Sequence, residues 1–350
     1  MDRRDFGKLL AFGTAAAALP SSAGAFHDPG PSGSRKIVKP KVLREGDTIG
    51  VTSPATQAFE YDRIRVTVEQ LEALGFRPKL GRHVADKHGY FAGTDENRAG
   101  DINAMFADDS VDGIIFFSGG WGSPRLLPLL DYDVIRKNPK VMMGYSDITA
   151  LLNGIHQRTG LVTFHGPNAS SRLPKYTLDH FKRVVMSTEP IGVLGNPVKK
   201  EDDLINRDYR IITIRGGIAS GQLVGGNLSL VAALMGTPWE VDTRGKIFLL
   251  EDIHEELYRV DRMLSTLDLG GKFADAAAVV FGYCSDCPVD GPSLSLEEIL
   301  REHLEDLGVP VMSGYAFGHI REMLTLPIGM EASVDTDAGT LTINDAAVHG

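Results

Sequence analysis

The chain has 350 residues, of which 43% are apolar and 23% charged, an ordinary composition for a globular protein with a large core. Its formal net charge of −10 and the lack of a basic stripe in the sequence argue against a protein that binds nucleic acid. A length of this order favours two domains over one.

The N-terminal residues have the pattern of an export signal. Arg3 and Arg4 are followed by the apolar, uncharged run Leu9–Leu19, and Ala23-Gly24-Ala25 provides the small residues of a cleavage site. Paired arginines indicate the twin-arginine route. The apolar run is too short to span a bilayer. We therefore expect residues 1–25 to be a signal peptide, and the protein to be periplasmic, without a membrane span, and soluble after cleavage near Ala25.

Residues 26–40 are rich in Pro, Gly, Ser and basic side chains, which predicts a flexible arm. Short apolar runs then alternate with amphipathic helical patterns, and this alternation predicts an α/β fold with a mainly parallel sheet covered by helices. The expected elements of the first half are strands at residues 48–52, 113–117 and 140–143 and helices at residues 61–74 and 95–106.

Prolines and a charged cluster interrupt this pattern between residues 171 and 210, which we interpret as a crossing between domains. The predicted organisation is an N-terminal α/β domain at residues 41–170 and a C-terminal domain at residues 211–350. The expected elements of the second half are strands at 222–224, 247–250 and 276–281, helices at 228–235, 256–267 and 296–307, and alternating short strands at 325–344.

A serine lies at a predicted corner between a strand and a helix. The apolar run Val141–Met143 enters Gly144-Tyr145-Ser146-Asp147, and an apolar helical pattern leaves it. Such a corner exposes the hydroxyl, and the N–H of the next residue can face an oxyanion. Ile148 occupies the place of the last glycine of G-x-S-x-G. The motif is therefore incomplete, and its weight depends on finding a base and an acid.

Two of the ten histidines are candidates for the base that a nucleophilic serine needs. His319 follows a glycine after an apolar stretch, and His165 ends an apolar strand. For the acid, Glu251 and Asp252 stand at the end of an apolar strand and should point to opposite faces, so only one of them should meet the site. The alternative is that both cap the following helix. The residues alone do not choose within either pair.

The sequence Ser118-Gly119-Gly120-Trp121-Gly122 follows a predicted strand and has few side chains to cover its backbone N–H groups. Such a turn can supply oxyanion donors or bind nucleotide phosphates. Neither a P-loop lysine nor G-x-G-x-x-G accompanies it, which disfavours phosphate binding.

The only two cysteines, Cys284 and Cys287, are spaced C-x-x-C in a predicted loop. One pair cannot complete a four-ligand zinc site by itself. We expect structural thiols or a small disulfide, and the sequence does not decide whether the two sulfurs are joined.

In this order, the motifs resemble those of the serine LD-carboxypeptidase family, which includes muramoyl-tetrapeptide carboxypeptidases and the microcin C immunity peptidases. The resemblance covers about residues 40–335. It is carried, in chain order, by Gly46-Asp47, Ser53-Pro54-Ala55, Gly119–Gly122 with Arg125-Leu126-Leu127, Gly144–Asp147, Gly225–Leu228, Leu250-Glu251-Asp252 with Tyr258-Arg259 and Asp261-Arg262, and Gly318-His319 with Leu326–Gly329.

The resemblance implies a Ser-Glu-His triad and chooses within both pairs. Ser146 would be the nucleophile, His319 the general base and acid, and Glu251 the residue that orients the imidazole. The reaction would hydrolyse the LD-peptide bond of a murein tetrapeptide and release the terminal D-alanine through an acyl-enzyme on Ser146. The partner would be a peptidoglycan-derived peptide, with no metal and no cofactor.

The resemblance also implies an oxyanion hole made by the N–H of Asp147 and one N–H from Gly119 or Gly120. The fold would be an N-terminal α/β sandwich that carries the serine and a C-terminal domain, richer in β structure, that carries the acid and the base. Ser118 and Trp121 replace the Arg and Tyr that are usual in the family turn, so we expect a changed pocket beside the backbone donors.

Three other functions fit parts of the sequence. The first is a peptidase or amidase that detoxifies a peptide-like antibiotic of the microcin C type, and the second is a non-catalytic periplasmic binding protein with two α/β lobes. The third is a conventional α/β-hydrolase, which Ile148 and the lack of an HGGG loop disfavour. The sequence leaves open the selectivity for the D-residue and the oligomeric state, including a homodimer.

Overall fold

The computed structural model describes residues 36–58, 61–198, 204–205, 208–289 and 291–350. The predicted signal peptide, and residues 26–35 of the predicted arm, lie outside the described residues. The chain from Arg35 to Gly350 is grouped in one compact unit, which is an α/β fold built on two sheets, as predicted. Across the described ranges, no helix combines the length and the apolar character needed to cross a membrane.

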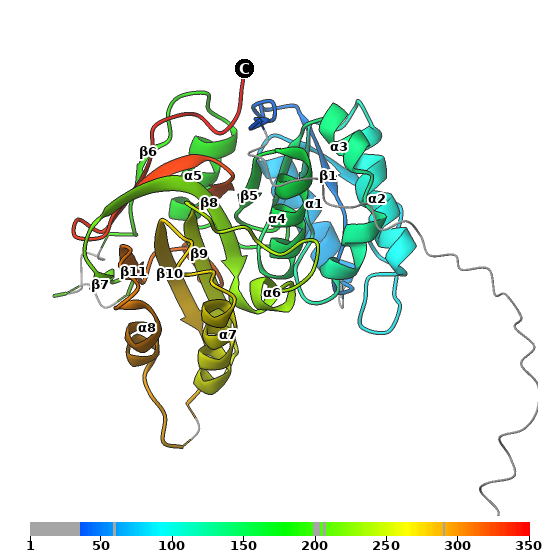
Figure 1. Cartoon of the computed structure of the whole chain (residues 1–350). Helices are drawn as coiled ribbons and strands as arrows, with labels where there is room; N and C mark the ends of the chain where they lie inside the picture. The colour runs from blue at the N-terminus through cyan, green and yellow to red at the C-terminus, as the bar shows by residue number, and fades with distance from the viewer. Residues whose placement is uncertain (1–35, 59–60, 199–203, 206–207, 290) are drawn as a thin grey trace, which may run out of the picture. The chain divides into compact units, whose positions relative to one another are not determined.

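The first sheet contains the predicted parallel strands of the N-terminal half. Its order is β12-β5-β4-β3-β1-β2, and all neighbours are parallel except β12, which runs antiparallel to β5. The strands are β1 (Thr48–Val51), β2 (Arg77–Leu80), β3 (Gly113–Ile115), β4 (Val141–Gly144), β5 (Thr163–His165) and β12 (Leu326–Ile328). Because β12 follows the whole second sheet except β13 and β14 in sequence, the C-terminal part of the chain completes the first sheet (Figure 1).

The second sheet is mixed, with the order β6-β14-β13-β8-β9-β10-β11-β7. Strands β8 to β11 are parallel to one another, and the other neighbours are antiparallel. The bounds are β6 (Gly192–Leu194), β7 (Ile212–Arg215), β8 (Ile218–Asn227), β9 (Ile247–Ile253), β10 (Ala278–Ser285), β11 (Val311–Ser313), β13 (Glu331–Asp335) and β14 (Thr340–Ile343). The expectation of a C-terminal part richer in β structure is confirmed.

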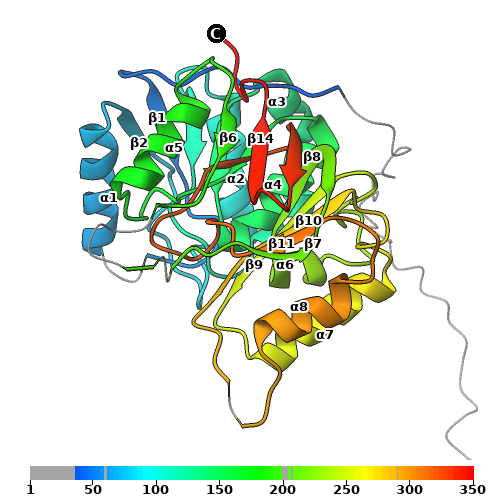
Figure 2. The ribbon, with the colours of Figure 1, turned by 90° about the vertical axis from the view of Figure 1, so that its left-hand side faces the viewer.

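Helices cover both sheets, and α7 and α8 lie together beside the second sheet (Figure 2). The helices are α1 (Tyr61–Ala73), α2 (Asp95–Ala107), η2 (Ser123–Leu129), α3 (Tyr132–Lys137), η3 (Ser146–Ile148), α4 (Thr149–Thr159), α5 (Lys175–Val185), α6 (Leu228–Ala233), α7 (Leu257–Leu269) and α8 (Leu296–Leu304). Helices α1, α2, α6, α7 and α8 occupy nearly the predicted bounds. The region predicted to be a crossing contains α5 and β6.

The alternation of side chains along β9 assigns its two faces to different cores. Ile247 and Leu249 belong to a core that includes residues of both sheets, whereas Phe248 and Leu250 pack with residues of α7 and α8. Because the strand continues to Ile253, the same alternation places the side chains of residues 251 and 252 on opposite faces.

A buried polar contact fixes α4 to β8. The side-chain Nδ2 of Asn153 donates to the carbonyl oxygen of Gly225 at 2.9 Å, and its Oδ1 accepts from the N–H of Gly225 at 2.9 Å. One turn earlier, the hydroxyl oxygen of Thr149 accepts from the N–H of Asn227 at 3.0 Å. The start of α4 is therefore held against the end of β8, a strand of the other sheet.

We expect Asn153→Ala to lower the free energy of unfolding by about 2–4 kcal/mol, because it leaves the buried N–H and C=O of Gly225 without partners. Equilibrium denaturation in urea measures this loss. Asn138→Ala is the matched control, since it removes one side-chain bond at the half-buried C-terminal end of α3. Equal losses in the two variants would contradict the role given to Asn153.

Candidate active site

Ser146 is the first residue of η3, two residues after the end of β4, and lies in the left-handed backbone region with φ of 67°. This conformation costs an ordinary L-residue about 1–2 kcal/mol and must be held by its surroundings. A Cβ on Gly144 would come within 2.9 Å of the Cγ2 of Ile148, which is fully buried. The isoleucine that departs from G-x-S-x-G therefore packs over the position where a side chain at Gly144 would lie, and the sharp turn is kept.

The glycine-rich turn after β3 lies directly on the serine. A Cβ on Gly119 would be 2.7 Å from the Cβ of Ser146, 3.0 Å from its Oγ and 3.3 Å from the backbone N of Asp147. A Cβ on Gly120 would instead meet the side chain of Thr56, 2.8 Å from its Cβ. The turn thus brings Gly119 against Ser146 and Asp147, whereas Gly120 faces Thr56.

The side chain of Asp147 joins this turn to the nucleophile turn. Its Oδ2 accepts from the N–H of Ser123 at 2.7 Å, and the hydroxyl of Ser123 donates to the carbonyl of Asp147. Burial raises the pKa of Asp147 to about 6, although the bonds from Ser123 and the charge of Arg98 act in the opposite direction. The two segments on which the sequence predicted the serine and the oxyanion donors are therefore fixed to each other.

Glu251 and His319 form the central hydrogen bond of the site. The carboxylate of Glu251 is fully buried on β9, and its Oε2 accepts from the Nδ1 of His319 at 2.7 Å. A proton on Nδ1 leaves Nε2 of the same imidazole free to accept another proton. The side chain of His319 keeps 11% of its surface exposed, so this second nitrogen belongs to a ring at the edge of solvent.

Tyr145, the residue before the serine, brings the serine turn and the histidine side by side. Its ring centroid lies 4.9 Å from that of His319. Within the described residues, Ser146 and His319 are not joined by a hydrogen bond. Bonds between a nucleophile and its base often tighten only when substrate is present, so this geometry is compatible with a nucleophile–base pair.

His165, the other histidine that the sequence pointed to, faces the same carboxylate. Its Nε2 lies 3.9 Å from Oε1 of Glu251, and its ring packs against Tyr145 and Phe317 at centroid distances of 6.3 and 5.7 Å. Complete burial lowers the pKa of His165 to about 4, so the imidazole is neutral at neutral pH. The sequence patterns point to both His165 and His319 but do not indicate that both face Glu251.

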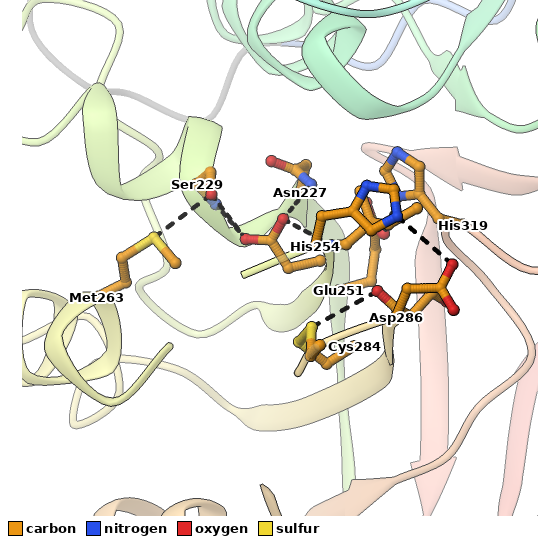
Figure 3. The surroundings of a disulfide bond; sticks show 12 residues. Asn227, Ser229, Glu251, His254, Met263, Cys284, Asp286 and His319 are labelled. Atoms are coloured by element: carbon orange, nitrogen blue, oxygen red, sulfur yellow. Dashed lines mark hydrogen bonds and ion pairs between the residues drawn. A yellow bond between two sulfur atoms is a disulfide. The ribbon is translucent and has the colours of Figure 1, made fainter. Parts of the chain in front are cut away.

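Asp252 has a different environment from Glu251, among the side chains of Asn227 and Ser229 that Figure 3 labels. It accepts from the side chains of Asn227 at 3.0 Å and Ser229 at 2.8 Å, at the start of α6. Burial and the negative charge of Glu251 raise the pKa of Asp252 to about 6. The two carboxylates thus lie on opposite faces, as predicted, and Glu251 is the one beside the histidines.

Cys284 and Cys287 are joined in a disulfide, the surroundings of which are drawn in Figure 3. In the register of β10 and β9, Cys284 pairs with Asp252. This answers the question that the sequence left open. In the part of the chain that the structure describes, no group of three or more His, Cys, Asp and Glu side chains is placed to hold a metal ion.

Comparison with known proteins finds two matching family models. The model of the LD-carboxypeptidase N-terminal domain matches residues 49–166, and that of the LD-carboxypeptidase C-terminal domain matches residues 220–334. A "Probable murein peptide carboxypeptidase" of Bacillus subtilis is 39% identical over 319 residues, which cover 89% of this chain and 96% of that protein.

Two solved structures share the fold over nearly their whole length. The microcin C7 self-immunity protein in its apo state has a TM-score of 0.80 and 29% identity, covering 89% of this chain and 100% of that one. The muramoyltetrapeptide carboxypeptidase of Oxalobacter formigenes has a TM-score of 0.73 and 29% identity, covering 87% and 100%.

The raised pKa of Asp147 predicts a specific pH dependence of stability. Its folded pKa of about 6 lies above the reference value of 3.8. The carboxyl therefore contributes stability that is present below about pH 4 and is lost as the pH rises through 6. We expect Asp147→Asn, which carries no charge at any pH, to gain about 2 kcal/mol relative to the wild type between pH 4 and pH 6, the interval between the two pKa values.

Thermal unfolding of the two proteins across this pH range measures the difference. Asp306→Asn, which removes an exposed carboxylate, controls for the loss of one negative charge. A difference between Asp147→Asn and the wild type that stays constant with pH would contradict the burial of a titrating charge at this position.

Proposed function

The chain belongs to the LD-carboxypeptidase family, and we propose that it is a serine carboxypeptidase that hydrolyses the LD-peptide bond of murein tetrapeptides and releases the terminal D-alanine. The observation that carries this proposal is the buried hydrogen bond between Glu251 and His319, beside a serine held at φ of 67°. The 39% identical Bacillus subtilis relative, described as a probable murein peptide carboxypeptidase, supports the class of substrate.

In the proposed reaction, the Oγ of Ser146 attacks the carbonyl carbon of the scissile peptide bond while Nε2 of His319 takes the hydroxyl proton. The imidazolium then gives this proton to the nitrogen of the leaving D-alanine, and an acyl-enzyme ester remains on Ser146. A water molecule that loses its proton to Nε2 attacks the ester, and the proton returns to Oγ when the shortened peptide leaves. Proton transfer of this kind contributes about 10²–10⁴-fold to the rate.

Glu251 has an orienting role in this scheme. Its bond to Nδ1 keeps the tautomer in which Nε2 is the base, and its negative charge stabilises the imidazolium that forms after proton transfer. Full burial of the carboxylate strengthens this charge interaction because water does not screen it.

The oxyanion would be stabilised by the N–H of Asp147 and by the turn at Gly119. The N–H of Asp147 lies in the first turn of η3, where helical N–H groups have no partner within the helix. Gly119 is a better candidate for the second oxyanion donor than Gly120, because Gly119 lies against both Ser146 and the backbone N of Asp147. Donors of this type are each worth about 10²–10³-fold in kcat.

A second candidate is a peptidase or amidase that detoxifies a peptide-like antibiotic with the same residues. It is favoured by the TM-score of 0.80 with the microcin C7 self-immunity protein, against 0.73 with the muramoyltetrapeptide carboxypeptidase. The identities of the two are equal at 29%, so sequence likeness does not separate the substrates. A periplasmic binding protein would have no use for a strained serine beside a Glu–His pair.

We expect Ser146→Ala to reduce the release of D-alanine from a disaccharide tetrapeptide by at least about 10³-fold, with an unchanged unfolding transition. Mass spectrometry of products from murein tripeptide, tetrapeptide and pentapeptide fragments, and from a peptidyl-nucleotide conjugate, measures activity and separates the two candidate substrates. Ser187→Ala, far from the nucleophile in sequence, is the matched control. Undiminished release of D-alanine by Ser146→Ala would contradict the proposed mechanism.

We also propose that the enzyme is exported through the twin-arginine route, which is supported by Arg3, Arg4 and the apolar run that follows them. Replacing both arginines with lysine should keep the full-length chain in the cytoplasm without a change in its net charge. Fractionation of cells that express the tagged chain measures this, with Arg35→Lys as the control. Equal periplasmic levels of the double variant and the wild type would contradict this route.

A further inference from the structure

His165 is a buried histidine that the proposed reaction does not use. It ends β5 of the first sheet, where it is paired with Leu326 of β12, and no part of it is exposed. Across the two sheets it faces Glu251 of β9. Besides His319, the carboxylate of Glu251 therefore has a second imidazole beside it, that of His165, which belongs to the sheet that also carries Ser146.

Polar atoms at this contact lack conventional partners. Among the described residues, neither Oε1 of Glu251 nor either ring nitrogen of His165 forms a hydrogen bond. Buried polar groups in folded proteins nearly always have partners, and a charged oxygen without one is especially costly. Nε2 of His165 lies 3.9 Å from Oε1.

The groups around His165 favour a neutral, donating imidazole. Glu251 supplies the negative charge, and its effect on the pKa of His165 opposes that of burial and of His319. The remaining neighbours are the rings of Tyr145 and Phe317, which offer no charge. With the ring neutral, a proton on Nε2 points a dipole at the carboxylate without adding a second positive charge beside His319.

We propose that His165 is a positioning residue for the catalytic carboxylate: its Nε2–H faces Oε1 of Glu251, so that Oε2 stays aimed at Nδ1 of His319. Each oxygen of Glu251 then has its own imidazole, one from each side, and rotation of the carboxylate is opposed. The contact also gives the second oxygen of this buried carboxylate a polar neighbour. This inference deepens the proposed function and rests on it.

The first test is kinetic. His165→Leu removes the dipole that faces Oε1, and we expect kcat for release of D-alanine to fall about 10-fold because the carboxylate can then rotate, with KM changed less than about twofold. His165→Gln places an amide N–H near the position of Nε2 and should recover most of the loss. His180→Leu, a partly buried histidine of α5 whose pKa burial also lowers, is the matched control and should keep the wild-type kcat.

A merely structural role for His165 would not produce this pattern, because leucine fills the site at least as well as glutamine. Full kcat in His165→Leu, or a loss in His165→Gln equal to that in His165→Leu, would overturn the inference.

The second test does not depend on activity. His165→Leu is compared in the wild-type and in the Glu251→Leu background by equilibrium unfolding. If Nε2–H serves Oε1, the unfolding equilibrium should shift at least about tenfold less in the Glu251→Leu background, where no carboxylate needs a donor.

Equal shifts in both backgrounds would overturn the contact even if Ser146→Ala abolishes turnover. Conversely, coupling between the two sites with no loss of D-alanine release in Ser146→Ala would leave the contact standing and contradict the proposed function. The two failures are therefore distinguishable.

Discussion

The buried carboxylate of Glu251 is the constraint on which the arrangement of the site depends. A charged group in a protein interior is stable only with close polar partners. The side chain of Glu251 lies on the face of β9 that is shared by both sheets, and it hydrogen-bonds to His319 at 2.7 Å. A shift of one residue in the pairing of β9 would place this charge among the apolar side chains under α7 and α8. The register of the second sheet therefore determines whether the carboxylate of Glu251 can reach His319.

The serine depends on a second set of contacts, from the first sheet. Ser146 occupies a strained backbone conformation that is maintained by packing of Ile148 over Gly144 and by the bonds between Asp147 and Ser123. Asn153 then holds the helix that follows against β8. The nucleophile and its partners are thus carried by different sheets, and buried hydrogen bonds rather than a flexible linker set their separation.

The sequence predicted the local parts of this arrangement. The strand–turn–helix around Ser146 and the amphipathic helices were visible because their signals span a few residues. The opposite directions of Glu251 and Asp252 followed from the period of a strand. Strand β2 has the sequence Arg-Pro-Lys-Leu, which contains no apolar run, so no local pattern predicts a strand there. It forms through parallel pairing with β1.

Long-range pairings were beyond the sequence patterns. Leu326–Ile328 joins the edge of the first sheet, and this return of the chain could not be inferred from a run of three residues. The sequence presents the two histidines as alternatives because the signal of each is local to its own segment. In the structure, each lies nearest a different oxygen of one carboxylate, a relation that the packing of the two sheets creates.

The central claim is that Glu251 acts on Ser146 through His319. A double-mutant cycle on kcat/KM for D-alanine release tests it most directly, with Glu251→Gln, His319→Ala and the double variant. If the three residues act as a unit, Glu251→Gln should cause almost no further loss once His319 is alanine. A loss in the double variant equal to the product of the two single losses would contradict the account.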